Sequence, residues 1–334
     1  MFSNMIIYRM AAQWEGSLEQ VEEALQKTPF MACGPTQEES AGWVPPRGED
    51  HGLLAESVGG QWILRFFTET KQIPADVLNR KVQEKADAIE KEFGRKPGRK
   101  EKRELKDEAV LDLLPLAFTK RSSMWVWIDP QAKFLVLDTG AQGKADEVVT
   151  LLVESLKGFG VALLDTQSSA QACMAHWLLT QEAPVGFTID RECELKAADE
   201  SKSVVRYNRH SLDIDEVKQH VEHGKLPTKL ALTWDDRVSF LLNDNLQIKK
   251  VAFTDTVLDQ AGDEGGFDTD VAIATGELAK LIPDLIEALG GEGRTEIGQP
   301  TTDASTLAVR VSKAGTVTGP ASAPQDTDTQ AAPF

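Results

Sequence analysis

Short apolar runs alternate with amphipathic segments along most of the chain. Apolar runs bounded by turn residues predict strands at 6–8, 53–58, 61–70, 123–129, 134–138, 161–165, 204–208, 228–234, 238–243 and 246–255. Apolar residues at helical spacing predict helices behind Ser17 and at 144–157, 168–180, 214–223 and about 276–289, the last kinked at Pro283. Ser17 and Gln20 have the spacing of a capping box, and Gly59-Gly60 is a two-residue hairpin signal. Short turns between neighbouring strands indicate antiparallel sheets, so the fold class predicted is α+β.

Residues 74–118 have a different pattern. Leu78, Val82 and Phe93 lie on one side of a predicted helix that begins at Pro74. The segment 94–98 contains two glycines and a proline and should break this helix, and a second helix is predicted from about 100 to 114. We therefore expect a protruding helical hairpin arm.

The turn of this hairpin is basic, although the protein has a formal net charge of -17. Eight cations face three glutamates between Lys91 and Lys106: Lys91, Arg95, Lys96, Arg99, Lys100, Lys102, Arg103 and Lys106 against Glu92, Glu101 and Glu104. A basic segment on an anionic body creates a directed field, and nucleic acid is its commonest target. The alternative is a solvated hairpin tip.

A second set of basic residues lies in the C-terminal half. Lys202, Arg206, Arg209 and His210 occupy or follow one predicted strand, and Lys225 and Lys229 flank the start of the next. Phosphate binding requires cations that are spread along a surface, so this set could extend the first. The alternative is scattered solubilising charge.

The clearest enzymatic pattern is Asp138-Thr139-Gly140 after an apolar strand, which resembles the catalytic loop of aspartic proteases. Those enzymes pair two such aspartates. The nearest second copy, Asp165-Thr166, is followed by Gln167 and is too close in sequence for a second lobe. We therefore expect Asp138 to have a structural role, with an aspartic hydrolase as the alternative. No phosphate loop, catalytic serine elbow, metal site or cofactor site is predicted.

Composition and segment boundaries complete the picture. Three widely spaced cysteines, no signal-peptide pattern and no apolar run of about 18 residues predict a cytoplasmic protein without a membrane partner. The predicted regions are 1–73 (N-terminal α+β), 74–118 (hairpin), 119–200 (central α+β), 201–295 (C-terminal α+β) and 296–334 (tail). The tail has almost no large apolar side chains and should be disordered.

Several segments together resemble the bacterial recombination-associated protein RdgC family, over residues 1 to about 293. They are Gly42-Trp43-Val44-Pro45-Pro46, Leu105-Lys106-Asp107-Glu108, Leu114-Pro115-Leu116-Ala117-Phe118, Met124-Trp125-Val126-Trp127-Ile128-Asp129, Thr228-Lys229-Leu230-Ala231-Leu232-Thr233-Trp234, Thr275-Gly276-Glu277-Leu278 and Gly290-Gly291-Glu292. Their order and spacing, rather than any one of them, carry the resemblance.

The resemblance implies a DNA-binding protein without catalytic activity. It implies horseshoe subunits that form a ring-shaped homodimer, whose basic hole admits duplex DNA without sequence preference. It also implies binding of single-stranded DNA, restraint of RecA-promoted strand exchange and association with the nucleoid. Arg95, Arg209 and His210 match hole-lining positions, and Phe118 matches an aromatic at a subunit contact. The alternative for Phe118 is an ordinary core aromatic.

The predicted DNA-binding residues combine both basic sets and are Arg95, Lys96, Arg99, Lys100, Arg206, Arg209, His210, Lys225 and Lys229. Besides the aspartic hydrolase, the alternative function is an interaction or scaffold protein whose basic arm binds an acidic protein partner.

Overall fold

The computed structural model describes residues 1–48, 52–259 and 265–293. The segment 296–334, predicted to be a disordered tail, lies outside the described residues. Within them, twelve strands form one sheet in which every strand pairing is antiparallel. Helices pack on this sheet, which confirms the predicted α+β class.

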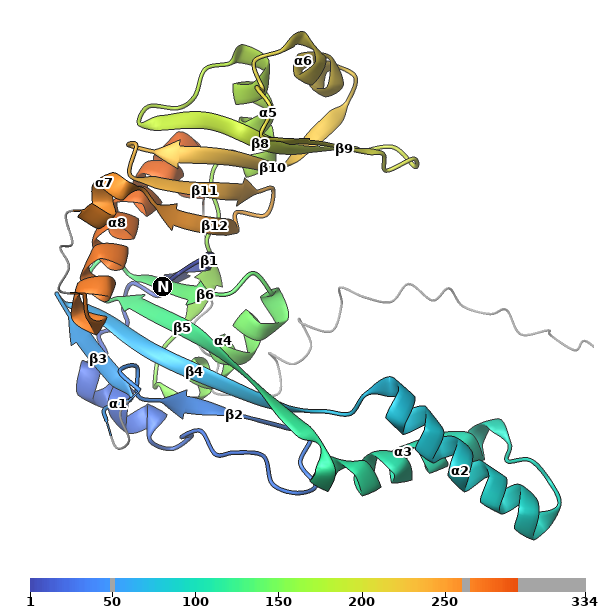
Figure 1. Ribbon diagram of the computed structural model, residues 1–334. Helices are drawn as coiled ribbons and strands as arrows, with labels where there is room; N and C mark the ends of the chain where they lie inside the picture. The colour runs from blue at the N-terminus through green and yellow to red at the C-terminus, as the bar shows by residue number, and fades with distance from the viewer. Residues whose placement is uncertain (49–51, 260–264, 294–334) are drawn as a thin grey trace, which may run out of the picture. The chain divides into compact units, whose positions relative to one another are not determined.

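Seven strands form the N-terminal half of the sheet, and most of them can be followed in Figure 1. They are β1 (Asn4–Met10), β2 (Glu39–Val44), β3 (Ala55–Val58), β4 (Gln61–Gln72), β5 (Phe118–Asp129), β6 (Phe134–Asp138) and β7 (Val161–Leu163). Their order is β2-β4-β5-β6-β1, with β3 beside β4 and β7 beside β1. Val58 pairs with Gln61 around Gly59 and Gly60, which both have positive φ. The predicted glycine hairpin is therefore confirmed.

Five strands form the C-terminal half. They are β8 (Phe187–Ala197), β9 (Val204–Asn208), β10 (Lys225–Trp234), β11 (Val238–Asn243) and β12 (Ile248–Phe253). Their order is β12-β11-β10-β8-β9, and β12 pairs with β1 to join the two halves.

Six helices lie outside the hairpin in the described residues. They are α1 (Leu18–Leu25), α4 (Gln142–Ser155), α5 (Ala170–Thr180), α6 (Asp215–Glu222), α7 (Asp255–Leu258) and α8 (Phe267–Ala288). The capping box predicted at Ser17 and Gln20 is present at the start of α1. Pro283 lies inside α8.

Strand alternation divides the apolar side chains between two cores. Leu64 and Phe66 of β4 pack in one core with α1 and α4, whereas Ile63 belongs to the other core with α5, α6 and α8. In the C-terminal half, Leu230 and Leu232 face that second core. Because neighbouring strand residues point to opposite faces, Lys229, Ala231 and Thr233 lie on the other face, and they are partly exposed.

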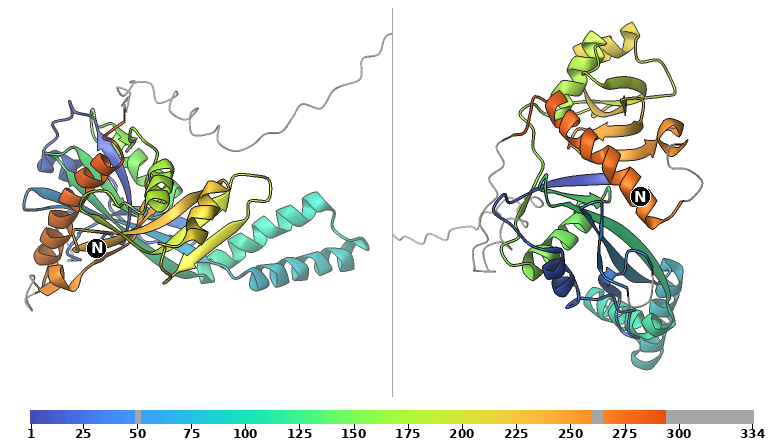
Figure 2. Two further views of the ribbon diagram at one scale, coloured as in Figure 1. Left: turned by 90° about the horizontal axis from the view of Figure 1, so that it is seen from above. Right: turned by 90° about the vertical axis from the view of Figure 1, so that its left-hand side faces the viewer.

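The predicted helical hairpin is confirmed. It consists of α2 (Ala75–Phe93) and α3 (Arg99–Leu113), followed by the short 3-10 helix η1 (Leu114–Leu116), and the two long helices run side by side in Figures 1 and 2. Few of their side chains are buried: Ala86, Leu105 and Ala109. Lys85 of α2 is ion-paired with Glu108 and Asp112 of α3, at 3.1 and 3.0 Å.

Several elements differ from the predictions. Strands β2 and β8 and the short helix α7 were not predicted. Strand β5 begins at Phe118 rather than 123, and α8 begins at Phe267, well before residue 276. The residues that open α8 are rich in Asp and Thr, which weakens its apolar pattern there. Projection of the hairpin as an arm, the ring-shaped dimer of horseshoe subunits and the region boundaries stay predictions.

Candidate nucleic-acid interface

The hairpin turn holds one of its cations in an ion pair. Gly94 ends α2 with φ of 67°, in the left-handed region that favours glycine. The two terminal nitrogens of Arg95 then donate to the carboxylate oxygens of Glu101, at 2.8 and 3.2 Å. Glu101 also accepts the backbone N–H of Gly98. The hydrogen bonds from Arg95 lower the pKa of Glu101, so this glutamate stays charged beside the predicted DNA contact.

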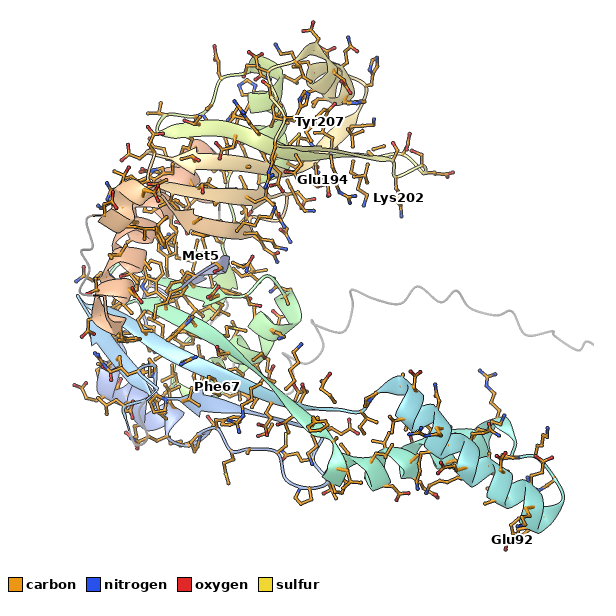
Figure 3. All side chains as sticks on the ribbon, viewed as in Figure 1. Met5, Phe67, Glu92, Glu194, Lys202 and Tyr207 are labelled. Atoms are coloured by element: carbon orange, nitrogen blue, oxygen red, sulfur yellow. The ribbon has the colours of Figure 1, made fainter. Side chains whose placement is uncertain are left out.

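The other predicted hairpin cations are free or nearly so. Lys96 and Arg99 are exposed, and within the described residues no carboxylate is ion-paired with either. The same holds for Lys102 and Arg103. Lys100 lies 3.9 Å from Glu104, but its side chain is 93% exposed, so this contact holds it weakly. Figure 3 shows this end of the hairpin, with Glu92 labelled at the last turn of α2.

The cations of the C-terminal sheet are arranged differently. Glu194 of β8 is the direct cross-strand neighbour of Arg206 on β9 and of Lys229 on β10. Its carboxylate accepts hydrogen bonds from Arg206 Nε at 2.6 Å, Lys229 Nζ at 3.0 Å and Thr228 Oγ1 at 2.8 Å. Burial of Glu194 opposes its ionisation, but the hydrogen bonds from Arg206, Thr228 and Lys229 outweigh burial and lower its pKa to about 2.

This cluster of Glu194, Arg206 and Lys229 is called the Glu194 cluster below. Its glutamate is labelled on β8 in Figure 3. The structure thus brings two of the predicted DNA-binding residues together, around an acidic residue that sequence reasoning missed.

The remaining predicted residues of this half are separate from the Glu194 cluster. Arg209 follows β9 with φ of 56°, is exposed, and lines a groove with Arg191 and Lys250. No ion pair to Arg209 is present in the described part of the chain. His210 is exposed, and its Nδ1 lies 2.8 Å from the carbonyl oxygen of Ser211. Lys225 Nζ lies 3.0 Å from Nδ1 of His220.

Phe118 is not a core aromatic. It opens β5 with 86% of its surface exposed, and nearby Leu116 is 80% exposed. The core alternative is therefore wrong, and a role at a subunit contact stays a prediction.

Asp138 makes structural contacts, as expected. Its Oδ2 and Oδ1 accept the backbone N–H groups of Phe2 and Asn4, both at 3.0 Å, which holds the start of β1 against the end of β6. Burial raises the pKa of Asp138, against the opposing effect of these hydrogen bonds. Across the described ranges, no group of three or more His, Cys, Asp or Glu side chains is placed to hold a metal ion. None of the helices described is long and apolar enough to span a membrane.

Comparison with known proteins gives a consistent family. Residues 1–292 match the family model described as "Putative exonuclease, RdgC". The chain is 44% identical over 300 residues to "Recombination-associated protein RdgC" of Dechloromonas aromatica, covering 87% of this chain and 98% of that protein. Proteins of the same name from Janthinobacterium sp. and Bordetella pertussis are 42% and 40% identical, over 87% and 88% of this chain and 98% and 99% of theirs. This chain therefore belongs to the RdgC family of recombination-associated proteins.

Proposed function

We propose that this protein binds DNA without reading its sequence, as a ring-shaped homodimer in the nucleoid, and restrains RecA-promoted strand exchange. The observation that carries DNA binding is the set of exposed hairpin cations that no carboxylate of the described residues neutralises: Lys96, Arg99, Lys102 and Arg103. They stand out in a chain whose formal net charge is -17.

The physical argument is counterion release. A lysine or arginine with no protein anion beside it can neutralise a phosphate and release the cation condensed on the DNA. Contacts to phosphate position a protein but carry no sequence information, so binding should be similar for unrelated duplexes. The acidic remainder of the protein would repel DNA and confine it to the basic segments.

The cations of the C-terminal half should also bind DNA, but they should differ in how much they contribute to affinity. Arg209 is exposed and has no ion-pair partner in the described chain, so it resembles the hairpin cations. Arg206 and Lys229 already share Glu194, and a phosphate must compete with that carboxylate for them. We expect them to contribute less to affinity than an equal number of unpaired cations.

The homodimer is supported by exposed apolar surface. Leu116 and Phe118 are large apolar side chains, two positions apart, that the described part of the subunit leaves uncovered. An aromatic at the centre of an interface is a common anchor of association. The role in recombination rests on family membership, because the relatives are named recombination-associated proteins.

Fluorescence anisotropy with several unrelated duplexes, measured over a series of salt concentrations, tests DNA binding. Log affinity should fall with log salt by ~0.9 per phosphate neutralised, with little difference between sequences. Salt-independent binding, or no duplex binding at all, would contradict the proposal and favour an acidic protein partner.

Two further assays test the rest of the proposal. If magnesium is added to the same samples, measurement of the DNA strand lengths over time would detect exonuclease activity. A RecA strand-exchange assay should show slower exchange as the protein is added.

A further inference from the structure

The two faces of β4 and β5 have opposite character. Arg65 of β4 is the cross-strand partner of Trp125 on β5. The neighbouring residues Leu64 and Phe66 point to the other face and belong to the core beneath α1 and α4. Arg65, Trp125 and Phe67 therefore share the face away from that core, and all three are partly exposed. Figure 3 labels Phe67 on β4.

Cations and aromatic rings form a continuous row on this face. The guanidinium carbon of Arg65 lies 4.7 Å from the ring centroid of Trp125 and 5.0 Å from that of Phe67. The ring of Phe67 is 5.6 Å from that of Phe30, and Arg121 lies 5.5 Å from the Phe30 centroid. These five residues are called the arginine–aromatic row. Both distances at Arg65 are within the range of cation–π interaction.

Of the two arginines in the row, only one is paired with a carboxylate. Arg121 donates from Nε to Glu69 at 2.6 Å, and the side chain of Glu69 is only 2% exposed. Arg65 has no carboxylate partner among the described residues, and its buried Nε has no hydrogen-bond acceptor. Burial accordingly lowers the pKa of Arg65. A partly buried guanidinium without an anion is costly, and a phosphate beside its terminal nitrogens would offset part of that cost.

The ring of Trp125 is supported from within the protein. It lies 6.1 Å from the ring of Phe267, the first residue of α8. Trp125 is nevertheless partly exposed, as are Phe30 and Phe67. Two of these rings are on the paired strands β4 and β5, and Phe30 lies in the segment before β2. Together the three rings present flat apolar surface beside an arginine that lacks an anion.

We propose that the arginine–aromatic row binds single-stranded nucleic acid, with bases stacked on Trp125 and Phe67 and a phosphate bound by Arg65. This inference rests on the proposed DNA-binding function and adds a site outside both basic sets. Unpaired bases can stack on protein rings, whereas the bases of a duplex are already stacked inside it. The row should therefore contribute to binding of single strands and not of duplexes.

The test compares three fluorescently labelled probes on the full-length protein. They are an oligothymidylate, an abasic strand with the same number of phosphates, and a duplex of the same length. Wild type should bind the oligothymidylate more tightly than the abasic strand. Trp125→Leu should weaken oligothymidylate binding ~10-fold, as expected for the loss of one stacked base, and leave the affinities for the other two probes unchanged.

Two further variants separate stacking from charge and from folding. Arg65→Lys keeps the charge but loses the planar guanidinium that binds the phosphate, so it should weaken binding of both single strands and leave the duplex affinity unchanged. Phe93→Leu is the matched control, because Phe93 is a 63% exposed aromatic on α2, outside the row. It should change none of the three affinities. If Trp125→Leu lowers the melting temperature, Phe67→Leu replaces it in the comparison.

Three results would overturn the site. One is an unchanged oligothymidylate affinity in Trp125→Leu and Arg65→Lys, and a second is an equal loss for all three probes. Equal affinity of wild type for thymidylate and abasic strands would do the same. These failures are distinct from failure of the proposed function, which would appear as absent or salt-independent duplex binding by wild type.

Discussion

The hairpin turn and the Glu194 cluster contain the same kinds of cation in different electrostatic settings. At the turn, Lys96 and Arg99 are exposed and no carboxylate of the described residues holds them. In the cluster, Arg206 and Lys229 both donate to one glutamate whose pKa is held at about 2. A count of lysines and arginines treats these regions as equal. The structure indicates that a phosphate meets free charge in the first and must displace a carboxylate in the second.

The largest expected effect comes from the unpaired hairpin cations. Changing Lys96, Arg99 and Lys102 together to Gln should weaken binding to every duplex and flatten the salt slope by up to ~2.7 for each subunit that contacts the DNA, at ~0.9 per phosphate contact. Stability should change little, because exposed charges contribute little to folding. Anisotropy over a salt series and thermal melts measure both quantities.

The control removes the same number of exposed cations elsewhere. Lys27, Lys144 and Lys157 are exposed, and none is ion-paired within the described residues. Their change to Gln alters net charge by the same amount and should leave the slope nearly intact. Equal losses in the two triple variants would mean that total charge, and not the hairpin, governs affinity.

The second effect should have the opposite sign. Glu194→Gln removes the carboxylate that competes for Arg206 and Lys229, so DNA affinity at neutral pH should rise and the salt slope steepen by up to ~1.8 for each subunit that contacts the DNA. The same variant should lose ~2 kcal/mol of stability, because charge-assisted hydrogen bonds disappear. A lower DNA affinity would instead show that Glu194 holds Arg206 and Lys229 in position for DNA. Pairing with a carboxylate would then favour DNA binding rather than compete with it.

Acid titration gives this variant an independent signature. The pKa of Glu194 is lowered from 4.5 to about 2 in the folded protein. The stabilisation from its ionised form is therefore complete above pH 4.5 and is lost as the pH falls to about 2. The stability difference between wild type and Glu194→Gln, measured by urea unfolding, should shrink over that interval. A difference that is constant with pH would contradict the lowered pKa.

A third prediction separates the effect of ion pairing on DNA affinity from the effect of a cation's position on the sheet. Arg209 and Arg206 lie close in sequence, but only Arg206 is ion-paired with a described residue. Arg209→Ala should flatten the salt slope by ~0.9 for each subunit that contacts the DNA, as a hairpin cation does, and Arg206→Ala by less. Arg95→Ala should also have the smaller effect, because Arg95 is paired with Glu101. If Arg206 and Arg209 give equal losses, position on the sheet matters more than pairing.

Sequence patterns predicted most elements, including the strands of Arg206 and Lys229, but not the strand that carries Glu194. Strand β8 was missed because Asp190-Arg191-Glu192 interrupts its alternation, at a place where its register with β10 also shifts. Without β8, the contact between Glu194 and Arg206, twelve residues apart, could not be predicted. Strand β2 was missed partly because it contains Gly42, and glycine is unfavourable in strand interiors. The structure shows why a glycine is needed there, since a Cβ at this position would lie 2.6 Å from the backbone of Phe30.

The candidate site shows the same limit of prediction from sequence, which finds single residues but not the contacts between them. The cations Lys96, Arg99 and Arg209 were identified from composition and resemblance, because charge is a property of single residues. Neither signal could reveal the arginine–aromatic row, whose members Phe30, Phe67 and Trp125 are far apart in sequence. Strand register alone brings Arg65 opposite Trp125. Pairwise features of this kind require the fold.

A fourth prediction concerns the number of copies of each region that a DNA molecule meets. In a homodimer both the hairpin and the Glu194 cluster occur twice, so affinity depends on association. Phe118→Ser should weaken association by ~2 kcal/mol without lowering the melting temperature, because Phe118 is 86% exposed. Analytical ultracentrifugation and DNA dissociation rates measure the effect. Unfolding of the variant would instead assign Phe118 a role in the subunit's own stability.

The smallest effect on DNA binding is expected at Asp138, which belongs to neither region. Asp138→Asn replaces one carboxylate oxygen with an NH2 group, which cannot accept the backbone N–H of both Phe2 and Asn4. The variant should therefore lose ~1–3 kcal/mol of stability, the cost of an unsatisfied buried donor, while its DNA affinity and salt slope stay those of wild type. Wild type and variant should also be equally inactive towards peptides at acidic pH. Acid proteolysis by wild type that this substitution abolishes would instead make Asp138 a catalytic residue.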